Sequence, residues 1–484
     1  MNNSNIIKSE LHFRREYGRK RLSMVNTRFL IPKILLFSLI TAFFIANPPN
    51  SAGAEVAELR LSLVTCIKIA LGDATSAKKG ENNLKLQGAE VMKSYGSFLP
   101  RLSTTAGYTP YTLSRSYSPL SNPVTINKTT SQSLDLTVTT TLNLFNGFRD
   151  YASLQSALNR ERAAEYTLSR ALESVIYDIT QTWYQALLDR ELLKISRENL
   201  LSVEDQLKLA DRQFQVGLKS ITDLYQQQAE VEQSRLSVMK AETRMERTQL
   251  ELVRRLRIEP RTKISLEADS LALTSPPAMK FDKEELVTRA LDQREDLKSK
   301  AMENKAAQWQ LKASRASWYP SVDLALNIRS QGVEYLNHEY PYPPLSEQVG
   351  KTVGYSARLN LTWAIFDGFQ TRYAVESAKI NHLNQLLDYE DLKKSIVIDL
   401  YQAAGDYASA YTQIETAQAG YTAARSAFHA VKRKYELGAA SFVELSAARA
   451  TLFNARSNLS QATYNLALQK NILDFTTGNV TQPQ

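Results

Sequence analysis

The sequence predicts an α+β fold in which one structural unit, made of a long helical hairpin and two β-strands, occurs twice in the chain. Three observations support this prediction: an internal repeat, two stretches whose apolar residues recur every seven positions, and four stretches in which apolar and polar residues alternate. A seven-residue period favours coiled-coil helices and a two-residue period favours strands, so both kinds of element are expected in each unit.

From the middle of each half to its end, residues of the first half recur 221 positions later, in register and without a net insertion, and a shift of 220 relates the residues upstream. The matches include the Phe-x-Gly-Phe motif at 145–148 and 366–369, and the pairs Gly217 and Gly438, Leu224 and Leu445, and Arg235 and Arg456. A unit of this length is far longer than a solenoid repeat, so each copy is a whole structural half. We expect a first repeat at 55–259, a linker at 260–281, a second repeat at 282–479 and a tail at 480–484.

Segment 1–54 is expected to be an N-terminal extension that ends in a cleavable Sec signal peptide. Basic residues precede an uncharged apolar run at 34–45, and small residues follow it at 51–54. This order is typical of a signal peptide, with cleavage expected after Ala54. A membrane anchor is the less favoured alternative, because the run is shorter than the roughly 20 residues that a helix needs to cross a bilayer.

Charge and cysteine content narrow the possible partners. Of the net charge of +9, the eight basic and two acidic residues of segment 1–54 account for +6, which leaves +3 on the exported chain. So small a charge gives no reason to expect nucleic-acid binding. Cys66 is the single cysteine, which excludes an intrachain disulfide, and we expect it at a small apolar position of the first helix.

The alternating stretches predict four strands, each with one apolar and one polar face. They are expected at about 101–112 and 133–145 in the first half and at about 320–330 and 353–366 in the second. The polar, proline-containing segments 114–131 and 331–351 between paired strands are expected to be loops. A soluble β-sandwich alternates likewise, but the two longer stretches exceed the about 9 to 11 residues of a transmembrane strand, which favours membrane insertion.

Apolar residues spaced by seven predict a helical hairpin in each half, at 149–256 and 370–475. In the first half these residues are Leu172, Ile179, Ala186, Leu193, Leu200, Leu207 and Phe214. In the second half they are Leu400, Tyr407, Ile414, Tyr421, Phe428 and Tyr435. A helix from 149 to 214 would be roughly 100 Å long, which no compact domain requires. Shorter helices are expected before the strands, at 59–71, 81–95 and 286–317.

Four strands cannot close a barrel, and an open sheet edge is not tolerated in lipid. Closure therefore needs other copies of the chain, and three copies would give twelve strands around a water-filled interior. The polar faces would then line the lumen, through Asp135, Asn143, Asp323, Arg329, Arg358 and Asn360. The sequence thus predicts a tube that crosses the outer membrane and continues into the periplasm as helical rods.

These features resemble the TolC family of outer-membrane efflux and secretion channels over about residues 57–479. The resemblance rests on the duplication, the proline before the first strand of each half, the Phe-x-Gly-Phe turn and the sequence Val-Gly-Leu-x-x-Ile-Thr-Asp near residue 220. It implies a homotrimer with a twelve-stranded barrel, an α-helical tunnel and no cofactor. It also implies that the chain is the exit duct of a tripartite efflux or type I secretion system, which passes small molecules or proteins. The implied partners are a periplasmic adaptor (a membrane fusion protein), an inner-membrane pump of the RND, ABC or MFS type, and outer-membrane lipid.

The resemblance also implies two functional sites at the turns that end the long helices. The implied adaptor-docking residues are Gly217, Leu218 and Gly438. The implied residues of a periplasmic gate are Asp223, Tyr435 and Glu444. Ala440 and Ala447 occupy positions where the family has an arginine and an acid, so the gate would be held differently here. Ordinary capping of the tip helices is the alternative interpretation of the same residues.

An enzyme is not expected, because the four histidines are scattered and the sequence has no metal-spaced cluster, P-loop or nucleophile elbow. The main rival to a channel is a soluble periplasmic coiled-coil scaffold or adaptor without a pore. Such a protein would explain the helices but not four long two-faced strands.

Overall fold

The computed structural model describes residues 59–118, 125–262, 264–267, 282–337 and 343–480. The expected signal segment at 1–54 lies outside the described residues, as do most of the expected linker and residues 481–484 of the tail.

The two repeats contain the same main elements in the same order. The first repeat consists of β1 (Leu59–Leu61), α2 (Leu63–Asp73), α3 (Thr75–Gly96), β2 (Arg101–Ser118), β3 (Thr125–Phe145), α4 (Arg149–Gln215) and α5 (Ile221–Leu256). After β4 (Ile264–Leu266), the second consists of α6 (Lys283–Gln293), α7 (Glu295–Arg315), the 3-10 turn η2 (Ala316–Trp318), β5 (Ser321–Tyr335), α8 (Leu345–Lys351), β6 (Val353–Thr362), α9 (Gln370–Glu436) and α10 (Phe442–Thr476). The two long helical hairpins lie within about a residue of the expected bounds.

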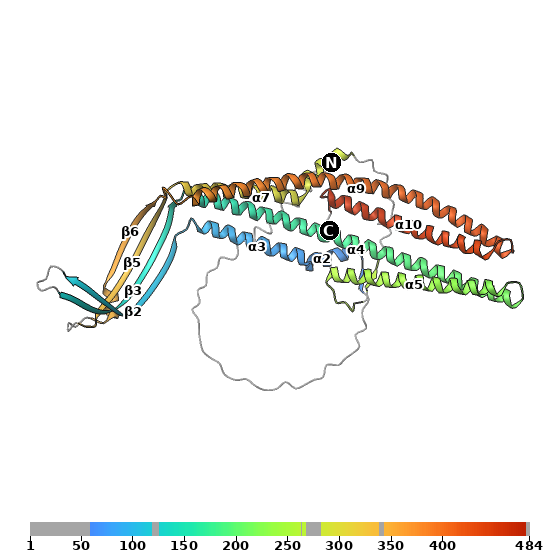
Figure 1. Cartoon of the computed structure of the whole chain (residues 1–484), viewed down its shortest axis with the longest axis horizontal. Helices are drawn as coiled ribbons and strands as arrows, with labels where there is room; N and C mark the ends of the chain where they lie inside the picture. The colour runs from blue at the N-terminus through green and yellow to red at the C-terminus, as the bar shows by residue number, and fades with distance from the viewer. Residues whose placement is uncertain (1–58, 119–124, 263, 268–281, 338–342, 481–484) are drawn as a thin grey trace, which may run out of the picture. The chain divides into compact units, whose positions relative to one another are not determined.

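Four strands form one antiparallel sheet in the order β2-β3-β5-β6, so β2 and β6 are its edge strands (Figure 1). The register is continuous along β5 and β6, and bulges interrupt it at Thr109 to Thr112 of β2 and at Asn143 to Phe145 of β3. The repeats therefore meet at the pairing of β3 with β5, and each repeat contributes one hairpin.

The predictions for two loops are partly wrong. Segment 114–131 is strand up to Ser118 and again from Thr125, and segment 331–351 contains the end of β5 and helix α8. The outer part of the β2–β3 hairpin is rich in Ser and Thr on both faces, so it lacks the alternation that reveals a half-buried strand. By contrast, β6 is shorter than expected, because it ends at Thr362, four residues before residue 366.

The short helices before the strands also differ from expectation. Leu59–Leu61 is a strand that pairs in parallel with Ile264–Leu266, where a helix was expected. The expected helix at 286–317 is divided at Arg294, whose extended backbone separates α6 from α7. A pairing between three-residue segments about 200 positions apart leaves no local pattern in the sequence.

The helices stand beside one another in the same order as the strands to which they are joined. Contacts run from α3 to α4, from α4 to α7 and from α7 to α9, while the connected strands are ordered β2, β3, β5 and β6. Further along the two long helices the neighbours are α5, α4, α10 and α9. Among the described helices, none is both long enough and apolar enough to cross a membrane.

In each repeat a tight turn joins the second strand of the hairpin to the long helix, β3 to α4 and β6 to α9. The Phe-x-Gly-Phe motif predicted both turns. Gly147 and Phe148 both have left-handed backbones, with φ of 67° and 64°, and Gly368 and Phe369 repeat them at 65° and 69°. A phenylalanine in this conformation is unusual. The ring of Phe148 packs edge-on against Phe145 at 5.5 Å between centroids, and the second motif has the same contact.

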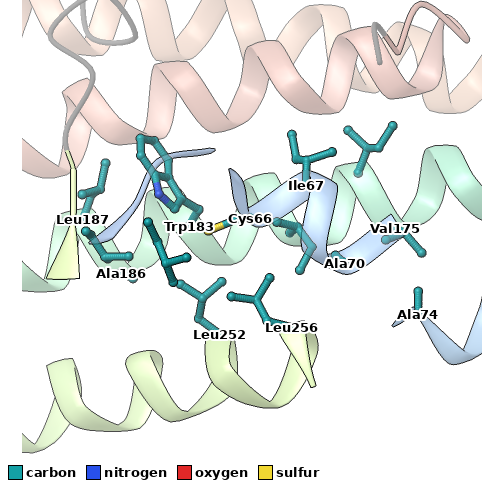
Figure 2. Packing of buried hydrophobic residues seen from close by; sticks show 14 of the residues in the cluster. Cys66, Ile67, Ala70, Ala74, Val175, Trp183, Ala186, Leu187, Leu252 and Leu256 are labelled. Carbon is teal, nitrogen blue, oxygen red and sulfur yellow. The ribbon is translucent and has the colours of Figure 1, made fainter. Parts of the chain in front are cut away.

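Each repeat has its own apolar core, where the short helices pack on the long hairpin. In the first repeat Cys66 and Ile67 of α2 lie against Trp183 of α4, together with Leu252 and Leu256 of α5 (Figure 2). Cys66 is fully buried, as expected, and burial raises the pKa of its thiol to about 12. The corresponding core of the second repeat holds Ala404 at the position equivalent to Trp183.

The seven-residue seams are buried in the middle of the long helices. Ile179, Ala186 and Leu193 are buried in α4, whereas Phe214 near its end is exposed. In α9 the buried positions continue as far as Phe428 and Tyr435. The period therefore identified the packed face of both helices, and the packing extends closer to the tip in the second repeat.

Candidate functional site

The register of the sheet places all six expected lumen residues on one face. Asn143, Asp323 and Asn360 are directly opposite one another on three neighbouring strands. Arg329 donates a hydrogen bond to Asp135 at 2.9 Å, and Arg358 is paired with Ala325 on the same face. Cross-strand partners share a face, so these residues form a continuous polar surface of mixed charge. That this surface lines a lumen remains a prediction.

The opposite face of the sheet is apolar, and much of it is exposed. Many of its large side chains are more than a third exposed, among them Leu102, Leu136, Leu326, Ile328, Tyr355, Leu359 and Leu361. Soluble monomers rarely expose contiguous apolar patches on this scale. The sheet therefore separates a surface suited to water from a surface suited to lipid.

The tip of the first hairpin is a glycine turn followed by a capped helix. Gly217 has a φ of 77°, and Leu218 is 74% exposed. Ser220 accepts a hydrogen bond from the backbone N–H of Asp223 at 3.1 Å, and the Asp223 carboxylate accepts one from the Ser220 N–H at 3.3 Å. This reciprocal capping box satisfies two backbone donors at the start of α5.

The second tip repeats this arrangement. Gly438 has a φ of 76°, and the Ser441 hydroxyl caps the N–H of Glu444 at 3.2 Å. The Glu444 carboxylate accepts from the Ser441 N–H at 2.7 Å, and these hydrogen bonds hold the pKa of Glu444 below its ordinary value. Glu444 is therefore charged at neutral pH, and capping accounts for its present contacts.

The expected gate residues Asp223 and Tyr435 are not hydrogen-bonded to each other in the described chain. The Asp223 carboxylate accepts a hydrogen bond within the capping box. The ammonium group of Lys219 lies over the buried ring of Tyr435, 4.2 Å from the ring centroid. Lys219 belongs to the first tip and Tyr435 to the end of α9, so this cation–π contact joins the two hairpins. Sequence reasoning missed Lys219 because nothing in the sequence around a lone lysine indicates an aromatic partner.

The two hairpins also meet further from the tips, on either side of a groove. The groove has a volume of about 900 Å³ and is lined by small and polar side chains of α4, α9 and α10, Gln185, Ser409 and Asn458 among them. Arg456 of α10 reaches across to Glu198 of α4, with 2.5 Å between nitrogen and oxygen. Within the described residues, no group of His, Cys, Asp and Glu is arranged to hold a metal ion.

A sheet with one apolar and one polar face, continued by paired helical rods, is the architecture of an outer-membrane channel protein. A family model described as outer membrane efflux protein matches residues 67–256 and 286–479, one stretch in each repeat. The chain belongs to this family. It is an outer-membrane channel protein of a Gram-negative bacterium, as the sequence predicted.

Individual relatives agree with this assignment. Protein CyaE of Bordetella pertussis is 26% identical over 408 residues, which cover 82% of this chain and 79% of the relative. Outer membrane protein TolC of Vibrio cholerae is 21% identical over 324 residues, which cover 66% of this chain and 70% of the relative. The structure of the CmeC outer-membrane channel of Campylobacter jejuni matches with a TM-score of 0.73 at 18% identity and covers 87% of each chain, which shows the shared fold.

Proposed function

We propose that three copies of the chain form one exit duct, with a barrel of twelve strands in the outer membrane and an α-helical tunnel in the periplasm. The observation that carries the proposal is the open sheet: the outer edges of β2 and β6 have no strand partner within the described chain, and the apolar face is exposed. Lipid offers no partners to unpaired backbone groups. Pairing β6 of one copy with β2 of the next supplies those hydrogen bonds.

The shared order of strands and helices supports a continuous tube. Each copy presents four strands and then four helices side by side, so closing the barrel also closes a wall of helices beyond it. The polar face of the sheet, with the ion pair of Arg329 and Asp135, would face the lumen and keep it hydrated. A barrel of twelve strands is wider than one of eight, whose side chains fill the interior.

The tips are the proposed docking surface for a periplasmic adaptor. Both turns expose apolar side chains: Val216, Leu218, Leu437 and Val443 are each at least two-thirds exposed. We propose no enzymatic activity for the chain. The duct itself would be passive, and an inner-membrane pump of the RND, ABC or MFS type would supply the energy. Its cargo would be small molecules or proteins.

Fractionation and reconstitution test the proposal. The full chain is expected in carbonate-washed outer membranes, as a species of three copies in native mass spectrometry, and as a conducting pore in planar bilayers. Recovery as a water-soluble monomer would refute the duct and favour the periplasmic scaffold. A membrane-bound protein of another copy number would refute the twelve-stranded barrel alone.

A further inference from the structure

Two arginines stand at opposite ends of one row of residues across the sheet. Arg101 is the first residue of β2 and is directly opposite Thr141 of β3. Thr141 is in turn opposite Ala325 of β5, and Ala325 is opposite Arg358 of β6. Cross-strand partners share a face, and Thr141 is on the same face of β3 as Asp135. Both arginines therefore belong to the polar face, although the sequence prediction for that face included Arg358 alone.

Neither arginine of this row has a counter-charge of its own. Arg329, on the same face, forms an ion pair with Asp135, with 2.9 Å between nitrogen and oxygen. Arg101 and Arg358 are exposed, and no ion pair or hydrogen bond joins their guanidinium groups to another described residue. The other charged residue on the polar face of the four strands is Asp323, in the next row. Three cations against two anions leave an excess of one positive charge per copy.

The row lies at the end of the sheet that is joined to the helices (Figure 1). β2 starts at Arg101, and β3 and β6 end four residues after Thr141 and Arg358. Neighbouring strands are about 4.8 Å apart, so three intervals separate the two arginines by about 14 Å. Strands of membrane barrels tilt by about 35–45°, so the row climbs along the barrel wall. Three copies would present two rings of three arginines, roughly 10 Å apart in height, where the helical tunnel opens into the barrel.

We propose that Arg101 and Arg358 form an anion-selective segment of the lumen, which attracts solutes that carry phosphate or carboxylate groups. Rings of arginine or lysine side chains make pores selective for anions. The rows on either side add no cation; they consist of Asn143, Asp323 and Asn360, and of Ser103, Thr139, Asn327 and Ser356. The inference rests on the proposed function, because the arginines line a passage only when several copies close the barrel.

Single-channel recording of the full chain in a KCl gradient tests the segment, using Arg101→Gln, Arg358→Gln and the double variant. The reversal potential gives the permeability ratio of chloride to potassium. We expect each single variant to lower this ratio about threefold, the effect of one charge on an ion about 7 Å away in water, and the double variant to lower it about tenfold. These changes should shrink at about 1 M salt, where charges are screened beyond about 3 Å. Asp323→Asn should change the ratio in the opposite direction.

Two variants serve as controls. Arg358→Lys keeps the charge and is expected to keep the permeability ratio. Arg115→Gln is the matched control, because Arg115 is also an exposed arginine of β2 but is opposite Lys128, which is on the other face of β3 from Asp135. We expect Arg115→Gln to leave the ratio unchanged. Native gels establish that each variant assembles like the wild type.

Inorganic triphosphate, added from the barrel side, is a second probe of the segment. We expect it to block the wild-type pore, and the double variant should require about tenfold more for the same block. Wild-type permeability ratios in both single variants, or equal block in the wild type and the double variant, would overturn the segment while leaving the duct in place. A wild-type chain that reaches the membrane but forms no pore would refute the duct, and the segment with it.

Discussion

The guanidinium group of Arg170 in α4 lies over the ring of Phe475 in α10, with its carbon 3.7 Å from the ring centroid. The same group donates to Glu173 at 2.8 Å and to the backbone oxygen of Phe475 at 3.2 Å, and it lies 3.7 Å from Asp296 at the start of α7. One side chain therefore joins three helices from both repeats.

We expect Arg170→Met to lower the free energy of unfolding by roughly 3 kcal/mol, because the side chain is 14% exposed and its loss leaves the half-buried Glu173 without this partner. Arg170→Lys should also destabilise, since an ammonium group lacks the planar fork that makes these contacts together. Denaturant unfolding in detergent measures both. Arg254→Lys, which alters an exposed pair with Glu251, is the control expected to change little. Wild-type stability in Arg170→Lys would contradict the role of the fork.

Asp474 of α10 predicts a pH-dependent stability difference. Burial raises the pKa of its carboxyl group, and the charge of Lys470 offsets this only in part. A folded-state pKa above the unfolded one means a contribution that is full at low pH and is lost as pH rises through the folded pKa. We expect Asp474→Asn to have a higher Tm than wild type in neutral buffer. The gain should vanish below the ordinary pKa of 3.8. A difference that is constant with pH would exclude burial of the charge as the cause.

Gly147 and Gly368 have the same backbone but different surroundings, which makes them a matched pair. An added Cβ at Gly147 would lie 2.6 Å from the backbone oxygen of Ala316, whereas none of the described atoms lies within 4 Å of the corresponding position at Gly368. Both alanine variants carry the strain of a left-handed backbone, about 1 to 2 kcal/mol. We therefore expect Gly147→Ala to lower Tm clearly more than Gly368→Ala. Equal losses would show that η2 moves aside at little cost.

The tip glycines allow a direct test of adaptor docking. Gly217 and Gly438 have positive φ, and a Cβ at either would meet open space, so valine there strains the turn without a clash. We expect Gly217→Val and Gly438→Val to abolish pull-down of the adaptor and efflux in cells while trimers persist on native gels. Gly217→Asn, which tolerates this backbone, is the control. Unchanged efflux in the valine variants would count against docking at the turns.

Glu444→Gln separates a capping role from a charge role. Glutamine keeps an oxygen that can accept the Ser441 N–H hydrogen bond, so the start of α10 should be preserved. Three copies would bring three such carboxylates to the mouth, and a ring of carboxylates binds cations. We expect weaker block by multivalent cations in single-channel recordings, with Asp223→Asn as the capping control at the first tip. If multivalent cations block Glu444→Gln as strongly as wild type, helix capping is the only role that remains for Glu444.

Much of the fold was predictable from local periodicity. The seven-residue seam from Leu172 onward located α4 almost to the residue, and the motif at 145–148 identified the turn before it. The alternation of Asp135 and Asn143 with apolar neighbours identified the polar face of β3. The outer part of the β2–β3 hairpin was missed because its Ser and Thr residues suit a strand or a loop equally well.

The sequence by itself determined the repeat, the helical rods, the two-faced strands and the family, because each of these is expressed by neighbouring residues in one element. Only the tertiary structure decided that Lys219 meets Tyr435, that Arg449 is buried, and that β1 pairs with β4. Those relationships join segments far apart in the chain. Their energies depend on distance and on the exclusion of water, which arise only when the two halves pack together.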